Sequence, residues 1–347
     1  MKRIILGSAV LVALTVMAPR GAAAANFGLL IGSADLDGDG TIEDVYNNLS
    51  SINVANGNTL SRSYSIGFTS WALLFGNFSS VQDLDGVPGA EVPVNIGGSL
   101  LIIHHASRST VTHPISPTTW APVPGGIIDL DGQPGKEVVL ITPTGMKLVQ
   151  ERTRNVQSVS ISGQFAVIGD AIADLDGTAG AEIPVANGAG LQIYSMVRGV
   201  LSSFPFSGNW AVCTSGSACV SDMDGTAGAE LLIAVPNAIQ ILRYRSGVVN
   251  SFPIGQQYAV LSDGVRDFDG SAGNDIAIAR ADGNLLILRP QVGVLQSING
   301  AGTFGSSWTL VGYINADGQP GDELRLRSTA NNRIYRVNPR SGTVSAE

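Results

Sequence analysis

The stretch Asp35–Glu43, which reads DLDGDGTIE, recurs along this chain in seven slightly different copies. The later copies are DLDGVPGAE from Asp83, DLDGQPGKE from Asp129, DLDGTAGAE from Asp174, DMDGTAGAE from Asp222, DFDGSAGND from Asp267 and NADGQPGDE from Asn315. Successive copies begin 45 to 48 residues apart. A fixed period of this length indicates a repeat architecture, either a solenoid or a propeller.

The first 25 residues have the features of a secretory signal peptide. Lys2 and Arg3 precede an apolar run over residues 4–17, and small residues occupy positions 22–25. Residues 26–347 then divide into seven units of about 46 residues, so we expect one repeat domain there. No later segment reaches the ~20 apolar residues of a membrane-spanning helix. We therefore expect an exported protein without a membrane span, located extracellularly, in a periplasm or at a cell surface, and a monomer.

Within each unit, short apolar runs alternate with turn residues. In the fourth unit the runs Phe165–Ile168, Ile183–Ala186, Leu191–Ser195 and Val200–Phe206 predict four antiparallel strands, with the acidic loop between the first two. Helical periodicity is nearly absent. The predicted fold is all-β: a seven-bladed propeller of four-stranded antiparallel blades. Pro93 and Pro184 interrupt the second strand of their units, so we expect each at a bulge or at the start of the strand.

The chain is acidic, and its acids are concentrated in the repeated loops. Without the three basic residues of the signal peptide, 17 basic residues stand against 28 acidic ones, and 21 of these acids occupy loop positions 1, 3, 5 or 9. Carboxylates this close repel one another and favour bound cations. No basic stripe with interleaved aromatic residues is present, which argues against a nucleic-acid partner.

A loop of this kind supplies oxygen ligands to a hard cation such as Ca²⁺. We expect carboxylates at positions 1, 3, 5 and 9 and a carbonyl at position 7 to bind up to seven Ca²⁺ ions. The candidate ligands are Asp35, Asp37, Asp39, Thr41 and Glu43; Asp83, Asp85 and Glu91; Asp129, Asp131 and Glu137; Asp174, Asp176 and Glu182; Asp222, Asp224 and Glu230; Asp267, Asp269 and Asp275; and Asn315, Asp317 and Glu323. The first loop has the most carboxylates, and the seventh the fewest. The alternative is a set of Asp-Gly hairpin turns that bind no metal.

This D-x-D-G loop followed by an apolar strand, repeated seven times, resembles the FG-GAP/VCBS repeat of integrin-α-type β-propellers and of many secreted bacterial proteins. The resemblance covers residues 26–347 and implies Ca²⁺ in the hairpin loops between strands A and B, and a role in adhesion or ligand recognition. The literal FG and GAP words are mostly missing, and loops 2 to 7 depart from the commoner D-x-D-x-D-G-x-x-D pattern.

Other residues have structural and functional interpretations. Cys213 and Cys219 are expected to form a disulfide in an exported protein. A ring residue begins strand A in most units: Trp71, Trp120, Phe165, Trp210, Tyr258 and Trp308. These rings could fill the space between blades, or all but Phe165 could form platforms for a ligand. His104, His105 and His113 are read as part of a solvated hairpin, with the adjacent pair on opposite faces of a strand.

No catalytic motif remains once these features are assigned: neither G-x-S-x-G, H-E-x-x-H nor a phosphate-binding loop is present. We therefore expect no catalytic residues and no enzyme activity. The predicted function is recognition of, or adhesion to, a glycan or an extracellular surface protein. The alternatives are a carbohydrate-active enzyme resembling the polysaccharide lyases with Ca²⁺-rich propellers, and a purely structural component of the envelope or surface.

Overall fold

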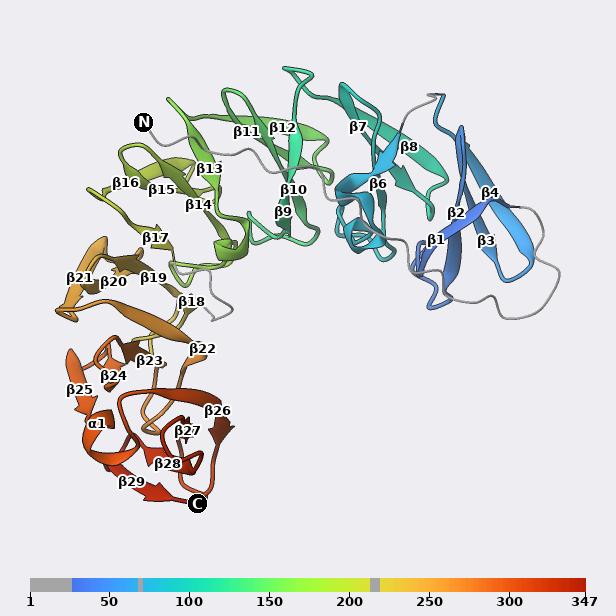
Figure 1. Cartoon of the computed structure of the whole chain (residues 1–347). Helices are drawn as coiled ribbons and strands as arrows, with labels where there is room; N and C mark the ends of the chain where they lie inside the picture. The colour runs from blue at the N-terminus through green and yellow to red at the C-terminus, as the bar shows by residue number, and fades with distance from the viewer. Residues whose placement is uncertain (1–26, 68–70, 213–218) are drawn as a thin grey trace.

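The computed structural model describes residues 27–67, 71–212 and 219–347. Its strands form seven antiparallel sheets that follow one another in chain order around an arc (Figure 1). Each sheet is built from consecutive strands, so no sheet combines the two ends of the chain. The predicted fold class, an all-β propeller of seven blades, is therefore confirmed. The predicted signal peptide over residues 1–25 lies outside the described residues.

Strands are called A to D in chain order within each blade. Blade 1 contains β1 (Leu29–Ala34), β2 (Glu43–Asn48), β3 (Ser51–Asn56) and β4 (Thr59–Ser65), and blade 2 contains β5 (Ala72–Leu73), β6 (Val92–Asn95), β7 (Ser99–His104) and β8 (Ser109–Pro114). Blade 3 contains β9 (Ala121–Ile128), β10 (Glu137–Thr142), β11 (Gly145–Gln150) and β12 (Asn155–Ser160), and blade 4 contains β13 (Phe165–Val167), β14 (Glu182–Asn187), β15 (Gly190–Ser195) and β16 (Val200–Pro205). Blade 6 contains β22 (Tyr258–Arg266), β23 (Asp275–Arg280), β24 (Leu285–Arg289) and β25 (Val294–Ile298), and blade 7 contains β26 (Trp308–Ile314), β27 (Glu323–Ser328), β28 (Ile334–Asn338) and β29 (Thr343–Ala346).

Blade 5 differs because its strand A is divided. The pieces β17 (Ala211–Val212) and β18 (Val220–Ser221) both pair with β19 (Glu230–Val235), which is followed by β20 (Ala238–Arg243) and β21 (Val248–Pro253). Residues 213–218, between the two pieces, lie outside the described part of the chain. The predicted Cys213–Cys219 disulfide falls on that segment; Cys219 itself is buried.

Strand B of blades 3 to 6 is buried over most of its length. In β19, for example, four successive residues from Glu230 to Ile233 are buried. Continuous burial follows because both faces of a blade are covered by neighbouring blades. Strand D is more exposed, as the pattern of β16 shows. Five hydrophobic clusters join successive blades from the first to the seventh.

Helices are short, as expected, and comprise η1 (Leu74–Gly76), η2 (Phe78–Ser80), η3 (Gly169–Ala171) and α1 (Gly300–Thr303). Three of these helices explain how strand B of blades 2 and 4 accommodates Pro93 and Pro184. In blade 4, β13 ends at Val167 and η3 follows, so strand A leaves the sheet beside Pro184. In blade 2, β5 ends at Leu73, before η1 and η2, and the ladder with β6 stops beside Pro93. Each proline therefore lies where strand A bulges away, as predicted.

The acidic loops join strands A and B and stack along the arc. At five of the six seams between blades, the backbone N–H at position 8 of one loop donates a hydrogen bond to the carbonyl at position 1 of the preceding loop. These pairs are Ala90 to Asp35, Ala181 to Asp129, Ala229 to Asp174, Asn274 to Asp222 and Asp322 to Asp267, at 2.8 to 3.0 Å. Neighbouring loops are thus held together by the backbone itself.

Glycines at position 7 permit this close approach. A Cβ added at Gly180 in loop 4 would lie 2.8 Å from the carbonyl oxygen of Leu130 in loop 3. Loop 1, which has no preceding loop, is the exception and carries Thr41 at this position. At the other end, a Cβ added at Gly318 of loop 7 would meet no atom within 4 Å among the residues that the structure describes. The loop stack therefore begins at blade 1 and ends at blade 7.

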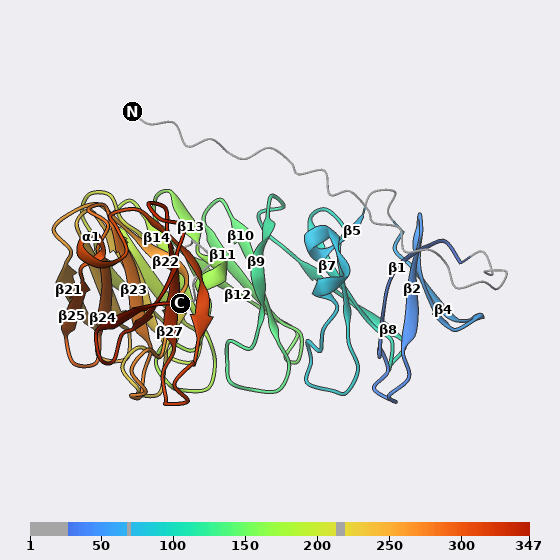
Figure 2. The same ribbon diagram turned by 60° about the horizontal axis from the view of Figure 1, so that its bottom comes forward.

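Blades 1 and 7 lie at the two ends of an open arc (Figures 1 and 2). Within the described residues, none of the hydrophobic clusters contains side chains of both blades. No helix in the described part of the chain has the length and apolar character needed to cross a membrane.

Candidate metal loops and ligand groove

The seven acidic loops share one hydrogen-bonding pattern. One oxygen of the position-9 carboxylate accepts from the backbone N–H at position 2 in every loop. The pairs are Leu36 to Glu43, Leu84 to Glu91, Leu130 to Glu137, Leu175 to Glu182, Met223 to Glu230, Phe268 to Asp275 and Ala316 to Glu323. The position-3 aspartate accepts in the same way from the N–H at position 5, as Asp85 does from Val87 at 2.8 Å. One oxygen of each carboxylate thus shapes the loop, and the second remains for a cation.

Position 1 completes the pattern in six loops. There Oδ1 of the aspartate accepts from the N–H of the glycine at position 4, as in Asp35 with Gly38 at 2.7 Å. Loop 7 has Asn315 instead, and its Nδ2 donates to the carbonyl of Gln319. An amide that donates inside the loop cannot replace the charge of a carboxylate. Loop 7 therefore offers one carboxylate fewer at the ligand positions than loops 2 to 6.

The position-9 carboxyls are buried, which disfavours their charged form. Burial, with repulsion from the other loop acids, raises the pKa of four of them to about 7, namely Glu137, Glu182, Glu230 and Asp275. Asp275 is fully buried, and its Oδ1 has no hydrogen-bond partner among the described residues. A buried carboxylate in this state favours a proton or a nearby cation.

Several of these loops contain acid groups close enough to hold a metal ion. The ligand atoms of Asp35, Asp37 and Asp39 lie within 4.8 Å of one another, and comparable sets occur in loops 2 to 5. In loops 3 to 7, however, an arginine lies beside the position-3 aspartate. The pairs are Arg152 with Asp131, Arg198 with Asp176, Arg243 with Asp224, Arg289 with Asp269 and Arg340 with Asp317, at 2.7 to 3.4 Å.

Because of these arginines, the loops differ in how well they could bind Ca²⁺. A guanidinium near the free carboxylate oxygen supplies positive charge where a dication would bind, so loops 3 to 7 are partly neutralised by the chain itself. In loop 1, by contrast, Asp35, Asp37 and Asp39 form no ion pair within the described residues, and each accepts a hydrogen bond from at least one backbone N–H of the loop. Loop 1 therefore fits a hard dication best.

The five arginines were not predicted from the sequence, although a spacing could have revealed two of them. Strand C runs antiparallel to strand B, which brings the residue 13 or 14 positions after the position-9 acid back beside the loop. Arg243 and Arg289 stand at this distance from Glu230 and Asp275, and both face the position-3 aspartate. His104 occupies the corresponding place after Glu91.

The expectation of a solvated histidine hairpin is wrong. His104, His105 and His113 are 3 to 7% exposed because the neighbouring blades cover them. The adjacent pair does point in opposite directions. His105 Nδ1 lies 2.8 Å from the hydroxyl of Tyr64 in blade 1, whereas His104 Nε2 lies 2.8 Å from Glu151 Oε1 in blade 3.

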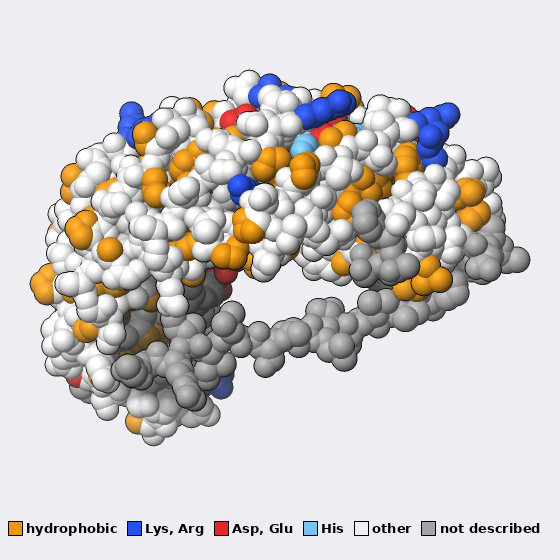
Figure 3. All heavy atoms as spheres, turned by 90° about the horizontal axis from the view of Figure 1, so that it is seen from above, with side chains coloured by type: hydrophobic (Ala, Val, Ile, Leu, Met, Phe, Trp, Pro, Cys, Tyr) orange, Lys and Arg blue, Asp and Glu red, His pale blue; other side chains and the backbone are white. Residues whose placement is uncertain are grey.

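Glu151 also contacts His113 Nε2 through its second oxygen, so one carboxylate joins both imidazoles. Burial acts to lower the pKa of His104, but hydrogen bonds to Glu151 and Glu91 outweigh it and raise that pKa to about 9. His105 lacks such a partner, and burial lowers its pKa. Figure 3 shows histidine (pale blue) beside acidic and basic side chains along one edge of the molecule.

The six strand-A rings are half-buried, and each packs against a core cluster. Three also donate hydrogen bonds to the preceding blade. Trp71 Nε1 contacts the carbonyl of Leu49 at 2.5 Å, Tyr258 Oη that of Val235 at 3.1 Å and Trp308 Nε1 that of Gly283 at 2.8 Å. Trp120 Nε1 is buried without a partner within the described residues. The hydrogen bonds of Trp71, Tyr258 and Trp308 show that these three rings join neighbouring blades.

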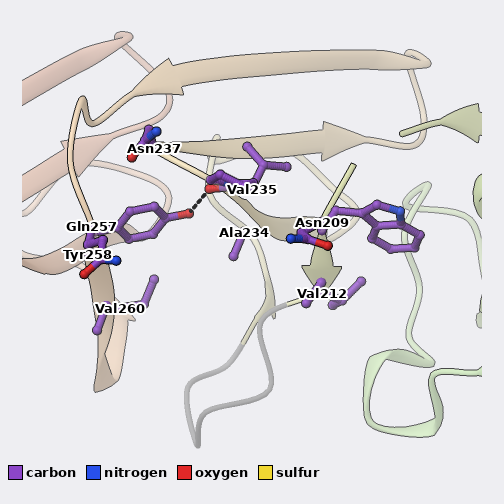
Figure 4. A pocket seen from close by; sticks show the side chains of 12 residues that line it. Asn209, Val212, Ala234, Val235, Asn237, Gln257, Tyr258 and Val260 are labelled. Carbon is purple, nitrogen blue, oxygen red and sulfur yellow. Dashed lines mark hydrogen bonds between the residues drawn. The ribbon is translucent and has the colours of Figure 1, made fainter. Parts of the chain in front are cut away.

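A groove of about 840 Å³ lies between the A strands of blades 5 and 6, next to two of these rings (Figure 4). Trp210 and Tyr258 line it together with Asn209, Asn237 and Gln257. The three amide side chains form no hydrogen bond within the described part of the chain. The groove meets strand A at its start, whereas the acidic loop follows its end, so the two lie on opposite faces of the propeller.

The fold and these sites define the class of protein as a seven-bladed β-propeller with acidic A–B loops. Neither the protein-family models nor the curated proteins include a match to this chain. Among solved structures, apo AztD from Citrobacter koseri is similar at 9% identity, over 90% of this chain and 84% of that one, with a TM-score of 0.37. The dihydro-heme d1 dehydrogenase NirN matches at 11% identity, over 95% of this chain and 65% of its own, with a TM-score of 0.41. The WD40 domain of SCAP from fission yeast matches at 13% identity, over 92% and 86%, with a TM-score of 0.32. The fold assignment rests on the seven sheets rather than on these distant likenesses.

Proposed function

We propose that this protein is an exported, non-catalytic recognition module of the FG-GAP/VCBS kind that binds a glycan on the face opposite its acidic loops. The observation that carries the proposal is the groove between blades 5 and 6. Its lining combines two aromatic rings with three amide side chains. Sugars are recognised by this combination, because ring faces pack on their C–H surfaces and amides bond their hydroxyls.

The residues that line the groove also bear on the alternative that the protein is a carbohydrate-active enzyme. No Asp, Glu or His is among the residues that line it. Hydrolysis of a glycoside commonly uses a pair of carboxyl groups at the scissile bond, and the described lining supplies none. A lyase, which cleaves by β-elimination, needs no such pair, so the lining argues against a hydrolase. The uncharged lining favours a neutral glycan over an acidic polysaccharide.

Ca²⁺ has a structural role in this proposal. Loop 1 is the strongest candidate, with Asp35, Asp37, Asp39 and Glu43 as carboxylate ligands and the carbonyl of Thr41 as a further one. A bound dication would neutralise the mutual repulsion of these acids and fix the first loop of the stack. The arginine-paired loops would depend on Ca²⁺ less.

A glycan-array screen followed by calorimetry on the best ligand tests the proposal. Asn209→Ala and Gln257→Ala should each weaken binding by about 5- to 30-fold, since each removes a hydrogen bond worth about 1–2 kcal/mol. Gln164→Ala is the matched control, because Gln164 precedes Phe165 in blade 4 as Gln257 precedes Tyr258 in blade 6. Unchanged affinity in both groove variants would refute the assignment of this groove.

A further inference from the structure

The loop of blade 2 differs in chemistry from the other six. His104, at the end of β7, places its Nδ1 3.3 Å from Oδ2 of Asp85 and 3.5 Å from Oε1 of Glu91. One ligand atom from each of the three side chains lies within 4.8 Å of the other two. Glu91 and His104 are 4% and 7% exposed, so this is a buried site containing nitrogen as well as oxygen.

The spacing of these atoms suits a small metal ion. Ligands bound tetrahedrally at about 2.0–2.1 Å lie about 3.3–3.4 Å from one another. The two distances from His104 Nδ1 are close to this value. Imidazole nitrogen is a ligand for zinc and other first-row transition metals, whereas Ca²⁺ prefers oxygen alone.

Outer groups hold the imidazole in the required orientation. Glu151 of blade 3 lies 2.8 Å from Nε2 of His104 and contacts His113 with its other oxygen. A carboxylate in this place accepts the Nε2 proton and so directs the Nδ1 lone pair of a neutral imidazole toward Asp85 and Glu91. Metal-binding histidines are commonly oriented by a carboxylate in this way.

The site also has room for a further ligand. A cavity of about 310 Å³ adjoins Asp85, Glu91 and His104 and is lined in addition by Arg152 and Arg154. A water molecule or a small anion in this cavity would complete four-coordination.

The other loops carry no imidazole at this place. Gln150, Arg243 and Arg289 stand there in blades 3, 5 and 6, and each contacts the position-3 aspartate of its own loop. A guanidinium remains protonated and cannot bind a metal. We propose that Asp85, Glu91 and His104 form a binding site for a first-row transition-metal dication such as Zn²⁺, with Glu151 as a positioning residue. This inference does not depend on the glycan groove or on Ca²⁺ at loop 1.

Calorimetric titration of the purified, chelator-treated protein with ZnCl₂ and, separately, with CaCl₂ tests the site. His104→Gln places the residue of blade 3 at the same position and should weaken the Zn²⁺ site by more than about 100-fold. Glu151→Gln should weaken it by about 10- to 100-fold, as expected for an outer-shell partner. Asp170→Asn, at an exposed acid in η3 outside the acidic loops, should leave Zn²⁺ affinity unchanged.

Co²⁺ provides a second readout that does not require a variant to fold. Substitution of Co²⁺ into a four-coordinate site with a histidine ligand should give visible absorption bands that Zn²⁺ removes stoichiometrically and equimolar Ca²⁺ does not. Equal Zn²⁺ affinity in wild type and His104→Gln, absence of these bands, or displacement by equimolar Ca²⁺ would each overturn the proposal. In those cases His104 would serve as an internal cation, as Arg243 does in loop 5.

Discussion

Nε of Arg243 lies 2.9 Å from Oδ2 of Asp224, so that blade 5 neutralises its own acidic loop with a residue of strand C. Arg243 also reaches the carbonyl of Pro290 in blade 6 at 3.2 Å. One side chain thus balances loop charge and crosses a seam between blades. Metal dependence should therefore vary from loop to loop according to which chain cation lies nearby.

Replacement of Arg243 by Gln should make loop 5 dependent on metal. Loss of one partner of this half-buried pair should lower the free energy of unfolding by about 1–3 kcal/mol in EDTA. Added Ca²⁺ should restore part of that loss by binding the unpaired acids. Thermal melts with and without 5–10 mM Ca²⁺, roughly the saturating range for extracellular sites, provide the measurement. An equal loss with and without Ca²⁺ would contradict the idea that the arginine occupies the place of a metal.

Chelation should lower the melting temperature of the wild-type protein, and loop 1 should account for more of the effect than loop 7. Ca²⁺ at 100 times its dissociation constant stabilises a folded protein by about 2.7 kcal/mol per site. Asp37→Ala should remove more of the Ca²⁺-dependent stabilisation than Asp317→Ala, because loop 7 has an Asn at position 1 and an arginine beside Asp317. Coincident melting curves in EDTA and Ca²⁺ would exclude a stabilising site in any loop.

The metal-free protein should lose stability as pH rises from about 4.5 to 7. Burial raises the pKa of four loop carboxyls to about 7 in the folded state, so between their unfolded and folded values the folded protein binds more protons than the unfolded one. Their contribution is complete below the unfolded pKa and is lost as pH rises through 7. His104, with its pKa raised to about 9, acts with the same sign between pH 6.5 and 9, while the lowered pKa of His105 opposes the trend below 6.5. Urea titrations in EDTA at several pH values should show this decline, and saturating Ca²⁺ should reduce it.

Gly270 and Gly318 form a matched pair that tests the stacking of the loops. Both occupy position 4 with positive φ, so alanine at either position should cost about 1–2 kcal/mol in backbone strain. At Gly270 the added Cβ would also lie 2.6 Å from Cβ of Pro320 in the next loop, which should add about 1–3 kcal/mol. Urea denaturation of the two variants measures the difference. Equal losses would indicate that loop 7 is covered by another part of the chain in solution, as in a closed ring.

Trp308 should contribute to stability and not to ligand binding. Trp308→Phe removes the hydrogen bond to Gly283 in blade 6 and should cost about 0.5–1.5 kcal/mol. Glycan affinity should be unchanged, whereas Trp210→Ala in the groove should abolish most of it. If the Trp308→Phe variant is fully folded but has lost glycan affinity, Trp308 is a ligand-binding residue.

The repeat period together with the four short strands in each unit was sufficient to predict the fold, because seven similar four-stranded units bury their sheets by stacking on one another. The four strands predicted in the fourth unit are found as β13, β14, β15 and β16, and each end lies within one residue of its predicted position. The acidic clusters of the loops were also evident in the sequence, since their spacing is local, whereas binding of Ca²⁺ to them stays a prediction. Contacts across strands and seams were not foreseen. Arg243 is indicated only once the register between strands B and C is considered, and Glu151 lies 47 residues from His104, so neither follows from the loop pattern itself.

The open loop stack gives the array a direction. Each loop inserts its position-7 glycine against the loop before it and presents its position-4 glycine to the loop after it, apart from Thr41 at the start and Gly318 at the end. A unit inserted into the array would contact the same two loop surfaces as its neighbours do. Inserting or deleting a unit should therefore change the free energy of unfolding by roughly the contribution of one repeat and one interface between repeats. Gene duplication could therefore lengthen or shorten this protein in whole units, with the first and last repeats retained as its two distinct termini.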